Sequence, residues 1–249
     1  MKETLIFIII SLFITTSFSQ DAETIINKYY ESIGTKESWR KLESRIDKYE
    51  TKRANIIPNE FSHEIKYSNV LMLRVAKRKD TINLVRLIFV NEKSPYDTTT
   101  SSFNGTDYWI QINGGNASNP FYDIKEVTRN SILGHPDIFT QADSLTFIET
   151  KQVDGKECNV IRVKIDRKES DYYFDSKTNY PIMYHPKNKF IKTKLNDYRD
   201  VQGLKIPFTE ELSNEFGVIS PNILSEIRLN IIIEDNYFSK LVGEGLTLE

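Results

Sequence analysis

The sequence of 249 residues contains a single cysteine, Cys158, and three histidines. One cysteine cannot form an internal disulfide, so an exported chain of this sequence would depend on burial of a hydrophobic core for its stability. Cys158 lies in a strand-like segment without a neighbouring histidine, which favours a small buried residue over a nucleophile. His63, His135 and His185 lack the spacing of metal ligands on one helix or hairpin, so no metal site is predicted.

No charge sign predominates, because 33 Lys and Arg residues stand against 35 Asp and Glu residues and give a net charge of −2. This balance provides no electrostatic reason to expect nucleic acid or anionic lipid head groups as partners. The Gly-x-Ser-x-Gly, P-loop and dinucleotide motifs are missing. Asp166, Asp171 and Asp175 flank a turn but lack the glycine and terminal glutamate of a calcium loop. The sequence therefore predicts no catalytic residue, no cofactor and no enzyme.

Long apolar runs are also missing, apart from one at the N-terminus. Met1-Lys2 is followed by an apolar run over 5–14 and by Ser17-Phe18-Ser19, which has small residues at both positions read by a signal peptidase. The run is short for a membrane span, so we predict a cleaved signal peptide over 1–19 and a periplasmic mature chain. An uncleaved anchor is the alternative. No cysteine follows the run, which excludes a lipid-anchored mature form, and we expect no stable membrane anchor.

What the sequence does contain is alternation of apolar and polar residues, with 12% aromatic residues. Between 153 and 208, short alternating segments are separated by turn signals such as Asp154-Gly155 and Gln202-Gly203. Short turns cannot connect parallel strands, so this stretch is predicted to be an antiparallel meander. Similar segments lie at 46–51, 61–75, 82–90, 98–112, 145–150, 209–216 and 225–234, with a turn expected at Ser220-Pro221-Asn222.

Two segments instead show helical spacing. The first begins at the potential cap Asp21, continues through Tyr29 and Tyr30 and ends near Gly34; the second covers 121–133 and ends at Gly134-His135-Pro136. A helix inserted among strands, without βα alternation, predicts a mainly β member of the α+β class with helices on one face of an antiparallel sheet. We expect one domain over 20–238, followed by a tail over 239–249.

Several motifs resemble one known family. The N-terminal motif combines Asp21-Ala22 with Ile25-Ile26, Tyr29-Tyr30, Ile33-Gly34, Trp39 and Lys41-Leu42, and two later runs are Asp171-Tyr172-Tyr173-Phe174-Asp175-Ser176-Lys177-Thr178 and Asp197-Tyr198-Arg199-Asp200-Val201-x-Gly203-Leu204-x-Ile206-Pro207-Phe208. Together they resemble the outer-membrane lipoprotein-sorting family (LolA/LolB-like), in the form common in Bacteroidetes. Thr35 stands where that pattern carries a second glycine. The resemblance implies an unclosed antiparallel β-barrel, with helices as a lid over an apolar cavity that carries the acyl chains of lipoproteins.

An apolar sheet face is too large for two short helices to cover, so part of it could be open to a ligand. The alternative for each residue is an ordinary core position. The predicted lining consists of Tyr67, Leu71, Leu73, Val85, Leu87, Phe89, Trp109, Phe121, Ile124, Ile161, Val163, Phe174, Leu229 and Ile231.

Two functions follow as hypotheses. The first is a monomeric periplasmic carrier of lipoprotein or lipid acyl chains, with envelope transport proteins as further partners and no nucleic acid. The second is a non-carrier envelope protein on the same scaffold, either a protein-binding module or an enzyme or sensor with its active groups at the rim.

Overall fold

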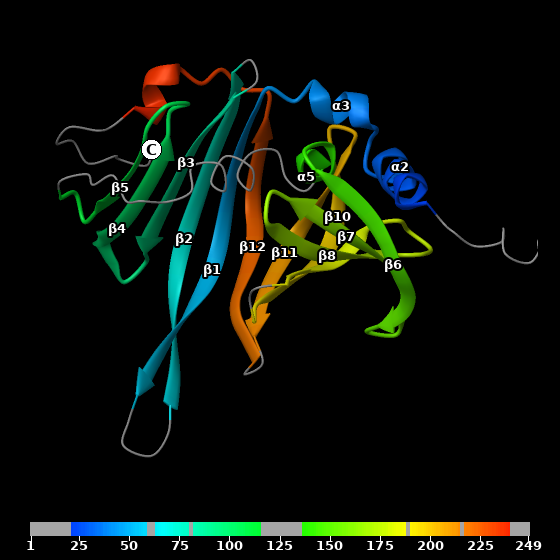
Figure 1. The fold of residues 1–249 in the computed structure, drawn as a ribbon. Helices are drawn as coiled ribbons and strands as arrows, with labels where there is room; N and C mark the ends of the chain where they lie inside the picture. Colours follow the sequence, from blue (N-terminus) through cyan, green and yellow to red (C-terminus); the bar gives the residue numbers. More distant parts are fainter. Residues whose placement is uncertain are drawn as a thin grey trace, which may run out of the picture.

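The computed structural model describes residues 21–58, 63–79, 82–115, 136–187, 190–214 and 217–239. Its strands form one antiparallel sheet of twelve strands in the order β5-β4-β3-β2-β1-β12-β11-β10-β9-β8-β7-β6 (Figure 1). The strands are β1 (Ser44–Pro58), β2 (His63–Lys79), β3 (Ile82–Asn91), β4 (Ser94–Phe103), β5 (Tyr108–Ile112), β6 (Ser144–Val153), β7 (Lys156–Ile165), β8 (Lys168–Asp175), β9 (Pro181–Pro186), β10 (Lys192–Val201), β11 (Leu204–Asn214) and β12 (Gly217–Leu229).

The first strand, β1, lies in the interior of this sheet. The chain runs from β1 outward to the edge strand β5, passes to the opposite edge at β6, and returns strand by strand to β12, which pairs with β1. The sheet is therefore an up-and-down meander that is open between β5 and β6 and curved (Figure 1). The predicted unclosed antiparallel sheet with helices on its concave face is confirmed.

Turn chemistry explains two of the hairpins. Asp154-Gly155 and Gln202-Gly203 each have positive φ at both positions, at 51° and 75° and at 54° and 83°, as two-residue hairpins of the type I′ kind require. The turn predicted at Ser220-Pro221-Asn222 is wrong, because Pro221 lies inside β12 and pairs with Glu211. The pairing of β12 with β1 ends at Asn222, so Pro221 needs no amide hydrogen bond on that side. The strand continues past Pro221 and ends at Leu229, and the next residue, Asn230, has a positive φ of 53°.

The first helix, α2 (Ala22–Ser32), agrees with its prediction. Asp21 caps it by accepting a hydrogen bond from the Glu23 amide at 3.2 Å, and Tyr29 and Tyr30 are among its buried residues. At Gly34, with φ of 108°, an added Cβ would lie 2.2 Å from the carbonyl oxygen of Gly203. Glycine is required here because the end of α2 lies directly against the β10–β11 turn.

Three shorter helices, α3 (Lys36–Arg40), α5 (Pro136–Thr140) and the 3₁₀-helix η1 (Asp235–Phe238), were not predicted. Thr35, in the position of the family's second glycine, has φ of 65°, and its hydroxyl accepts a hydrogen bond from the Ser38 amide to cap α3. α5 begins at Pro136, a residue suited to a first helical position, although the sequence pattern placed a helix end there. The helix predicted over 121–133 lies outside the described residues. Among those described, no helix combines the length and apolar content needed to cross a membrane.

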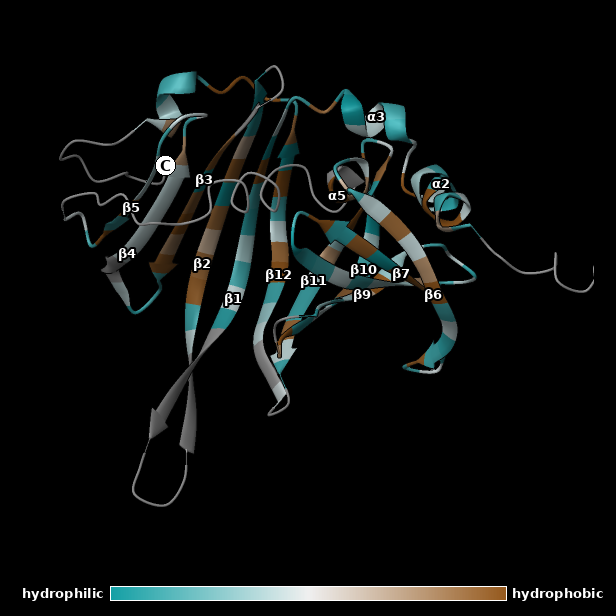
Figure 2. Cartoon of the chain, viewed as in Figure 1, coloured by the Kyte–Doolittle hydropathy of each residue, from teal (hydrophilic) through white to brown (hydrophobic). Residues whose placement is uncertain are grey.

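The two faces of the sheet bury different clusters. We call the face against which α2, α3 and α5 pack the inner face, and its core extends from Ala76 and Val85 to Ile161, Tyr172 and Phe174. On the opposite, outer face, Val75 and Leu84 pack with Phe238 of η1. A second outer cluster, containing Cys158, Val160, Tyr173, Ile182 and Met183, covers β7 to β9. Both faces of β2 and β3 are thus apolar, whereas β1 between them and β12 is mostly hydrophilic (Figure 2).

Candidate functional site

The middle of the inner face is polar. β1 sends Arg45, Asp47, Tyr49 and Thr51 to this face by strand alternation, since Tyr49 belongs to the inner core. All four are buried, and Asp47 has no exposed surface. A central strand that directs two charged residues inward is contrary to the usual apolar-in pattern, so these side chains need partners on the same face.

Asp47 provides the partner for two arginines. Arg45 Nε donates to Asp47 Oδ1 and Arg74 Nε donates to Asp47 Oδ2, both at 2.6 Å. Arg74 Nη2 also donates to the Tyr49 hydroxyl at 2.7 Å. Burial alone would lower the pKa of the Arg74 guanidinium, but Asp47 beside it holds that pKa above its ordinary value. Burial raises the pKa of the Tyr49 hydroxyl, so Tyr49 is neutral near neutral pH.

Glu210 completes this group from the other side of β12. It lies on β11 opposite Asn222, and it interacts electrostatically with Arg74 and Tyr49. Unlike Asp47, it is only half-buried. We call Arg45, Asp47, Tyr49, Arg74 and Glu210 the inner polar cluster. Its formal charge is zero with Glu210, and one positive charge remains when only Arg45, Asp47 and Arg74 are counted.

Neutral polar groups lie next to the inner polar cluster on β1 and β12, and we call the cluster and these groups together the polar strip. The Thr51 hydroxyl lies 2.8 Å from the Ser220 hydroxyl and 2.6 Å from Asn222 Oδ1. Neither Ser220 nor Asn222 is fully buried. The strip thus passes from charged groups near Arg45 to hydroxyl and amide groups near Asn222.

Apolar side chains flank the polar strip on both sides. On one side, Leu87 pairs with Arg74 and Phe89 pairs with Met72, which places all three apolar residues on the inner face. On the other side lie Phe208 and Ile227. Each of these five apolar residues is only partly buried. This part of the inner face therefore offers partly accessible apolar surface around a charged centre.

The rest of the inner face is filled by aromatic rings. Tyr29 of α2 lies 5.4 Å from the ring of Phe139 of α5 and 5.5 Å from that of Phe174. Phe139 lies 5.0 Å from Tyr172, and Tyr172 stacks on Tyr184. Side chains from the helices thus occupy the surface over β7 to β9, and this half resembles an ordinary core.

The predicted lining residues are divided between the two faces. The inner core contains Val85, Leu87, Ile161, Val163, Phe174 and Leu229, and Phe89 shares their face. Leu73 and Ile231 belong to the outer cluster with Val75 and Phe238. Leu71 alternates with Met72 and also lies on the outer face. Tyr67 lies in β2 where side chains are not described, and Phe121 and Ile124 lie outside the described residues. Whether the inner set binds a ligand stays a prediction.

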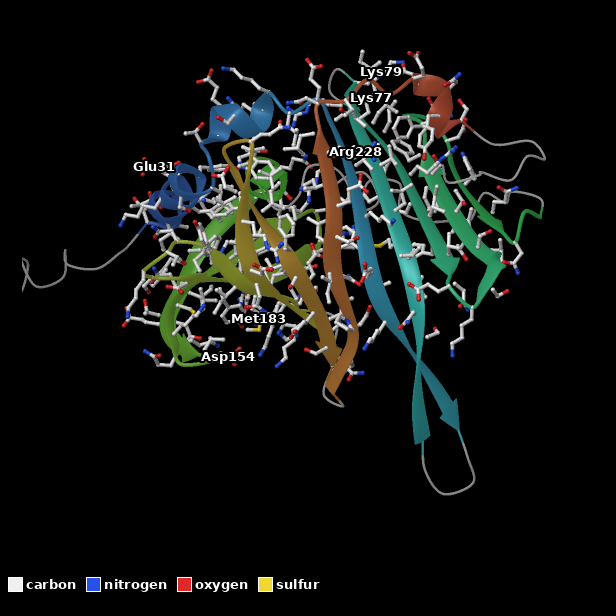
Figure 3. All side chains as sticks on the ribbon, turned by 180° about the vertical axis from the view of Figure 1, so that it is seen from behind. Glu31, Lys77, Lys79, Asp154, Met183 and Arg228 are labelled. Carbon is white, nitrogen blue, oxygen red and sulfur yellow. The ribbon has the colours of Figure 1, made fainter. Side chains whose placement is uncertain are left out.

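Trp109 belongs to a separate outer site. Its ring lies 5.2 Å from the guanidinium of Arg86, which also lies 4.6 Å from the ring of Tyr237. Arg86 Nη2 donates to the Ser239 carbonyl oxygen at 2.7 Å, and Lys77 and Lys79 pair with Asp235 close by (Figure 3). These contacts hold η1 against the outer face of β2 to β5.

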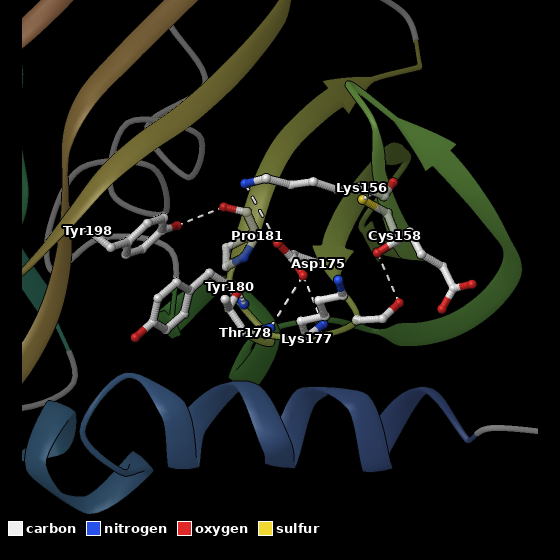
Figure 4. Close-up of polar contacts among 10 residues, drawn as sticks. Lys156, Cys158, Asp175, Lys177, Thr178, Tyr180, Pro181 and Tyr198 are labelled. Atoms are coloured by element: carbon white, nitrogen blue, oxygen red, sulfur yellow. Dashed lines mark hydrogen bonds and ion pairs between the residues drawn. The ribbon is translucent and has the colours of Figure 1, made fainter.

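Cys158 and Asp175 have structural roles. Burial raises the pKa of the Cys158 thiol to about 11, so it is a protonated core residue at neutral pH. Asp175 Oδ1 accepts hydrogen bonds from the amides of Lys177 and Thr178, as a turn-capping residue does (Figure 4). In the described part of the chain, no three His, Cys, Asp or Glu side chains are grouped so that they could hold a metal ion.

The inner polar cluster was missed from the sequence. Arg74 alternates with Val75 of the outer cluster and lies beside Asp47 on the inner face. A signal was present at 44–51, where Arg45, Asp47 and Thr51 share one phase and Ile46 the other. A strand whose polar phase also carries an aromatic residue, Tyr49, can face a partly polar interior.

Known proteins resemble this chain in fold and not in sequence. No protein-family model and no curated protein sequence matches the chain. Solved structures do match: a DUF1329 family protein from Desulfovibrio piger, with a TM-score of 0.60 and 11% identity, covers 88% of this chain and 97% of its own. The LolA superfamily protein NE2245 from Nitrosomonas europaea has a TM-score of 0.58 and 12% identity, with the same coverage of both chains. The chain therefore has a LolA/LolB-like fold, as its motifs indicated.

Proposed function

We propose that this protein is a periplasmic carrier that binds one acyl-bearing molecule on its inner face, in lipoprotein sorting or envelope lipid transport. The observation that carries the proposal is the partly exposed apolar surface of Met72, Leu87, Phe89, Phe208 and Ile227, on a scaffold of the LolA/LolB-like fold. The predicted signal peptide over 1–19 supports export. Aromatic packing over β7 to β9 leaves the β1–β3 and β11–β12 region as the binding surface.

The physical driving force is burial of methylene groups. Each methylene removed from water contributes about 0.8 kcal/mol, so an acyl chain lying along Leu87 and Phe89 binds through contact area. The same contact removes water from the apolar side chains of the protein. We expect an extended chain to lie on the inner face beside the polar strip, because partly exposed apolar residues flank this strip on both sides.

The test uses the chain from Gln20 onward, stripped of lipid and then mixed with a fatty acid and a monoacylglycerol of equal chain length. Native mass spectrometry should show a one-to-one complex, and fluorescence titration with an acyl probe gives its Kd. Leu87→Gln should weaken binding by about tenfold, since it places a polar amide under the acyl chain. Ile223→Gln is the matched control, because Ile223 is 51% exposed and pairs with Glu50 on the outer face.

Phe89→Gln provides a second inner-face variant in case Leu87→Gln fails to fold, which circular dichroism would reveal. Equal loss of affinity in Leu87→Gln and Ile223→Gln would place the acyl chain elsewhere. A folded wild-type protein that takes up no acyl compound would overturn the carrier proposal and favour the non-carrier alternative.

A further inference from the structure

The inner polar cluster is unusual for a surface that binds only an acyl chain. A hydrocarbon placed over the cluster would remove from water the accessible part of Arg74, 15% of its side chain, and the half-buried Glu210 without replacing their hydrogen bonds, which is unfavourable. The cluster nevertheless lies between the apolar side chains Leu87 and Phe208, where the proposed ligand would sit. A ligand that suits this face therefore has a polar group as well as a tail.

The chemistry of the cluster indicates the sign of that group. The guanidinium groups of Arg45 and Arg74 each carry five N–H donors and cannot lose their charge. Asp47 offers only two oxygens to both arginines, through Nε of each and Nη2 of Arg74. Guanidinium groups match the planar, paired oxygens of carboxylate and phosphate. The whole protein has a net charge of −2, but Arg45, Asp47 and Arg74 together carry one positive charge, which favours an anion that can compete with Glu210.

Resting on the proposed function, we propose that the inner polar cluster binds the anionic head group of the carried amphiphile, a phosphate or a carboxylate. Arg74, the more exposed of the two arginines, with 15% of its side chain accessible against 4% for Arg45, makes the direct contact. Asp47 positions both arginines and is itself fully enclosed. The acyl tail then lies along Leu87 and Phe89 of β3, and Leu87 is the cross-strand neighbour of Arg74 on β2.

Glu210 should weaken the binding of a ligand with an anionic head group. Its negative charge offsets the positive charge of the cluster, because it lies on β11 opposite Asn222 of the same face and acts electrostatically on Arg74. An anionic head group has to compete with this carboxylate for Arg74. Removing the charge of Glu210 should therefore strengthen the binding of anionic amphiphiles and leave neutral ones unchanged, which is the reverse of what a loss of packing would do.

The experiment compares three probes with one acyl chain: a lysophosphatidic acid, the fatty acid and the monoacylglycerol. Wild type should bind both anionic probes about tenfold more tightly than the monoacylglycerol, as expected for a charge-assisted contact. Glu210→Gln should tighten the anionic probes by about three- to tenfold and leave the monoacylglycerol unchanged. Arg45→Gln should weaken only the anionic probes.

Glu211→Gln is the matched control, because it removes the same charge from the adjacent residue of β11, which pairs with Lys194 on the outer face. It should change none of the three affinities. Inorganic phosphate is added as a competitor, and we expect no displacement of the lysophosphatidic acid. Displacement by phosphate that also strengthens in Glu210→Gln would assign the cluster to a free oxyanion and overturn the head-group proposal.

The same measurements distinguish a protein without the head-group site from a protein that is no carrier. Equal affinities for the three probes, unchanged in Glu210→Gln, would overturn the head-group site while leaving the carrier intact. No binding of any probe to folded wild type would overturn both. Because Glu210 is only half-buried and its substitution by Gln keeps the size of the side chain, Glu210→Gln should not unfold the protein, so these outcomes can be separated.

Discussion

Two buried aspartates on opposite faces of the sheet have the same chemistry in different surroundings. Asp47, on the inner face, is held by Arg45 and Arg74. Asp171, on the outer face of β8, is held by Arg162 at 2.8 Å and by Lys187 at 2.7 Å. The partners of Asp171 are 30% and 44% exposed, whereas those of Asp47 are 4% and 15% exposed.

The difference separates a structural ion pair from a candidate binding group. Water reaches the cations around Asp171, so their charges are solvated and each pair contributes modestly to stability. Around Asp47 the cations are largely removed from water, and the desolvation cost is offset by the carboxylate, the Tyr49 hydroxyl and the charge of Glu210. The inner group is also surrounded by partly exposed apolar residues, which places it where an amphiphile would bind.

The largest expected effect is from Asp47→Asn. The substitution keeps the shape of the side chain but leaves Arg45 and Arg74 buried without their counter-charge. We expect the free energy of unfolding to fall by about 3–5 kcal/mol, the usual cost of breaking a buried pair. Urea unfolding followed by circular dichroism measures it.

A triple variant checks the cause. In Arg45→Met/Asp47→Leu/Arg74→Met all three charges are replaced by apolar groups, and a substantial part of the lost stability should return. If the triple variant is as unstable as Asp47→Asn, the loss comes from packing, and the contrast between the two aspartates would not be electrostatic.

A smaller effect is expected from Asp171→Asn. Arg162 and Lys187 can turn to water when the carboxylate is lost, so the free energy of unfolding should fall by only about 1–2 kcal/mol. The loss should shrink further when urea unfolding is repeated in 1 M salt, because exposed partners are screened. A loss as large as that of Asp47→Asn would mean that exposure of the partners does not set the strength of these pairs.

The sequence was sufficient to predict the meander and its opening helix. Local signals determine both, since Asp154-Gly155 and Gln202-Gly203 specify tight hairpins and Asp21 caps α2. Pro221 misled the prediction because proline is usual in turns, but the one-sided pairing of β12 there depends on where its pairing with β1 ends. Such a fact is tertiary and has no local signature.

The candidate site was harder to predict for a similar reason. Alternation shows that Leu73 and Arg74 face opposite ways, but both faces of β2 are covered, so hydrophobicity does not indicate which one is inner. The predicted lining therefore combined inner residues such as Phe174 with outer ones such as Leu73. The inner polar cluster joins β1, β2 and β11, which are brought together only when β12 pairs with β1.

The smallest predicted effect is the pH dependence of the stability that Asp171 contributes through Arg162 and Lys187. We call this group of ion pairs the outer pair. Burial alone would raise the pKa of Asp171, but hydrogen bonds from Arg162 and Lys187 bring it below its ordinary value of 3.8. A carboxyl with a lowered folded-state pKa adds stability that is fully present above 3.8 and is lost as the pH falls through the folded-state pKa. Measured by urea unfolding, the gap between wild type and Asp171→Asn should be constant from pH 7 to 5 and shrink by less than about 1 kcal/mol toward pH 3. A gap that stays unchanged down to pH 3 would show that Asp171 acts through its shape, and the outer pair could then not serve as the electrostatic reference for Asp47.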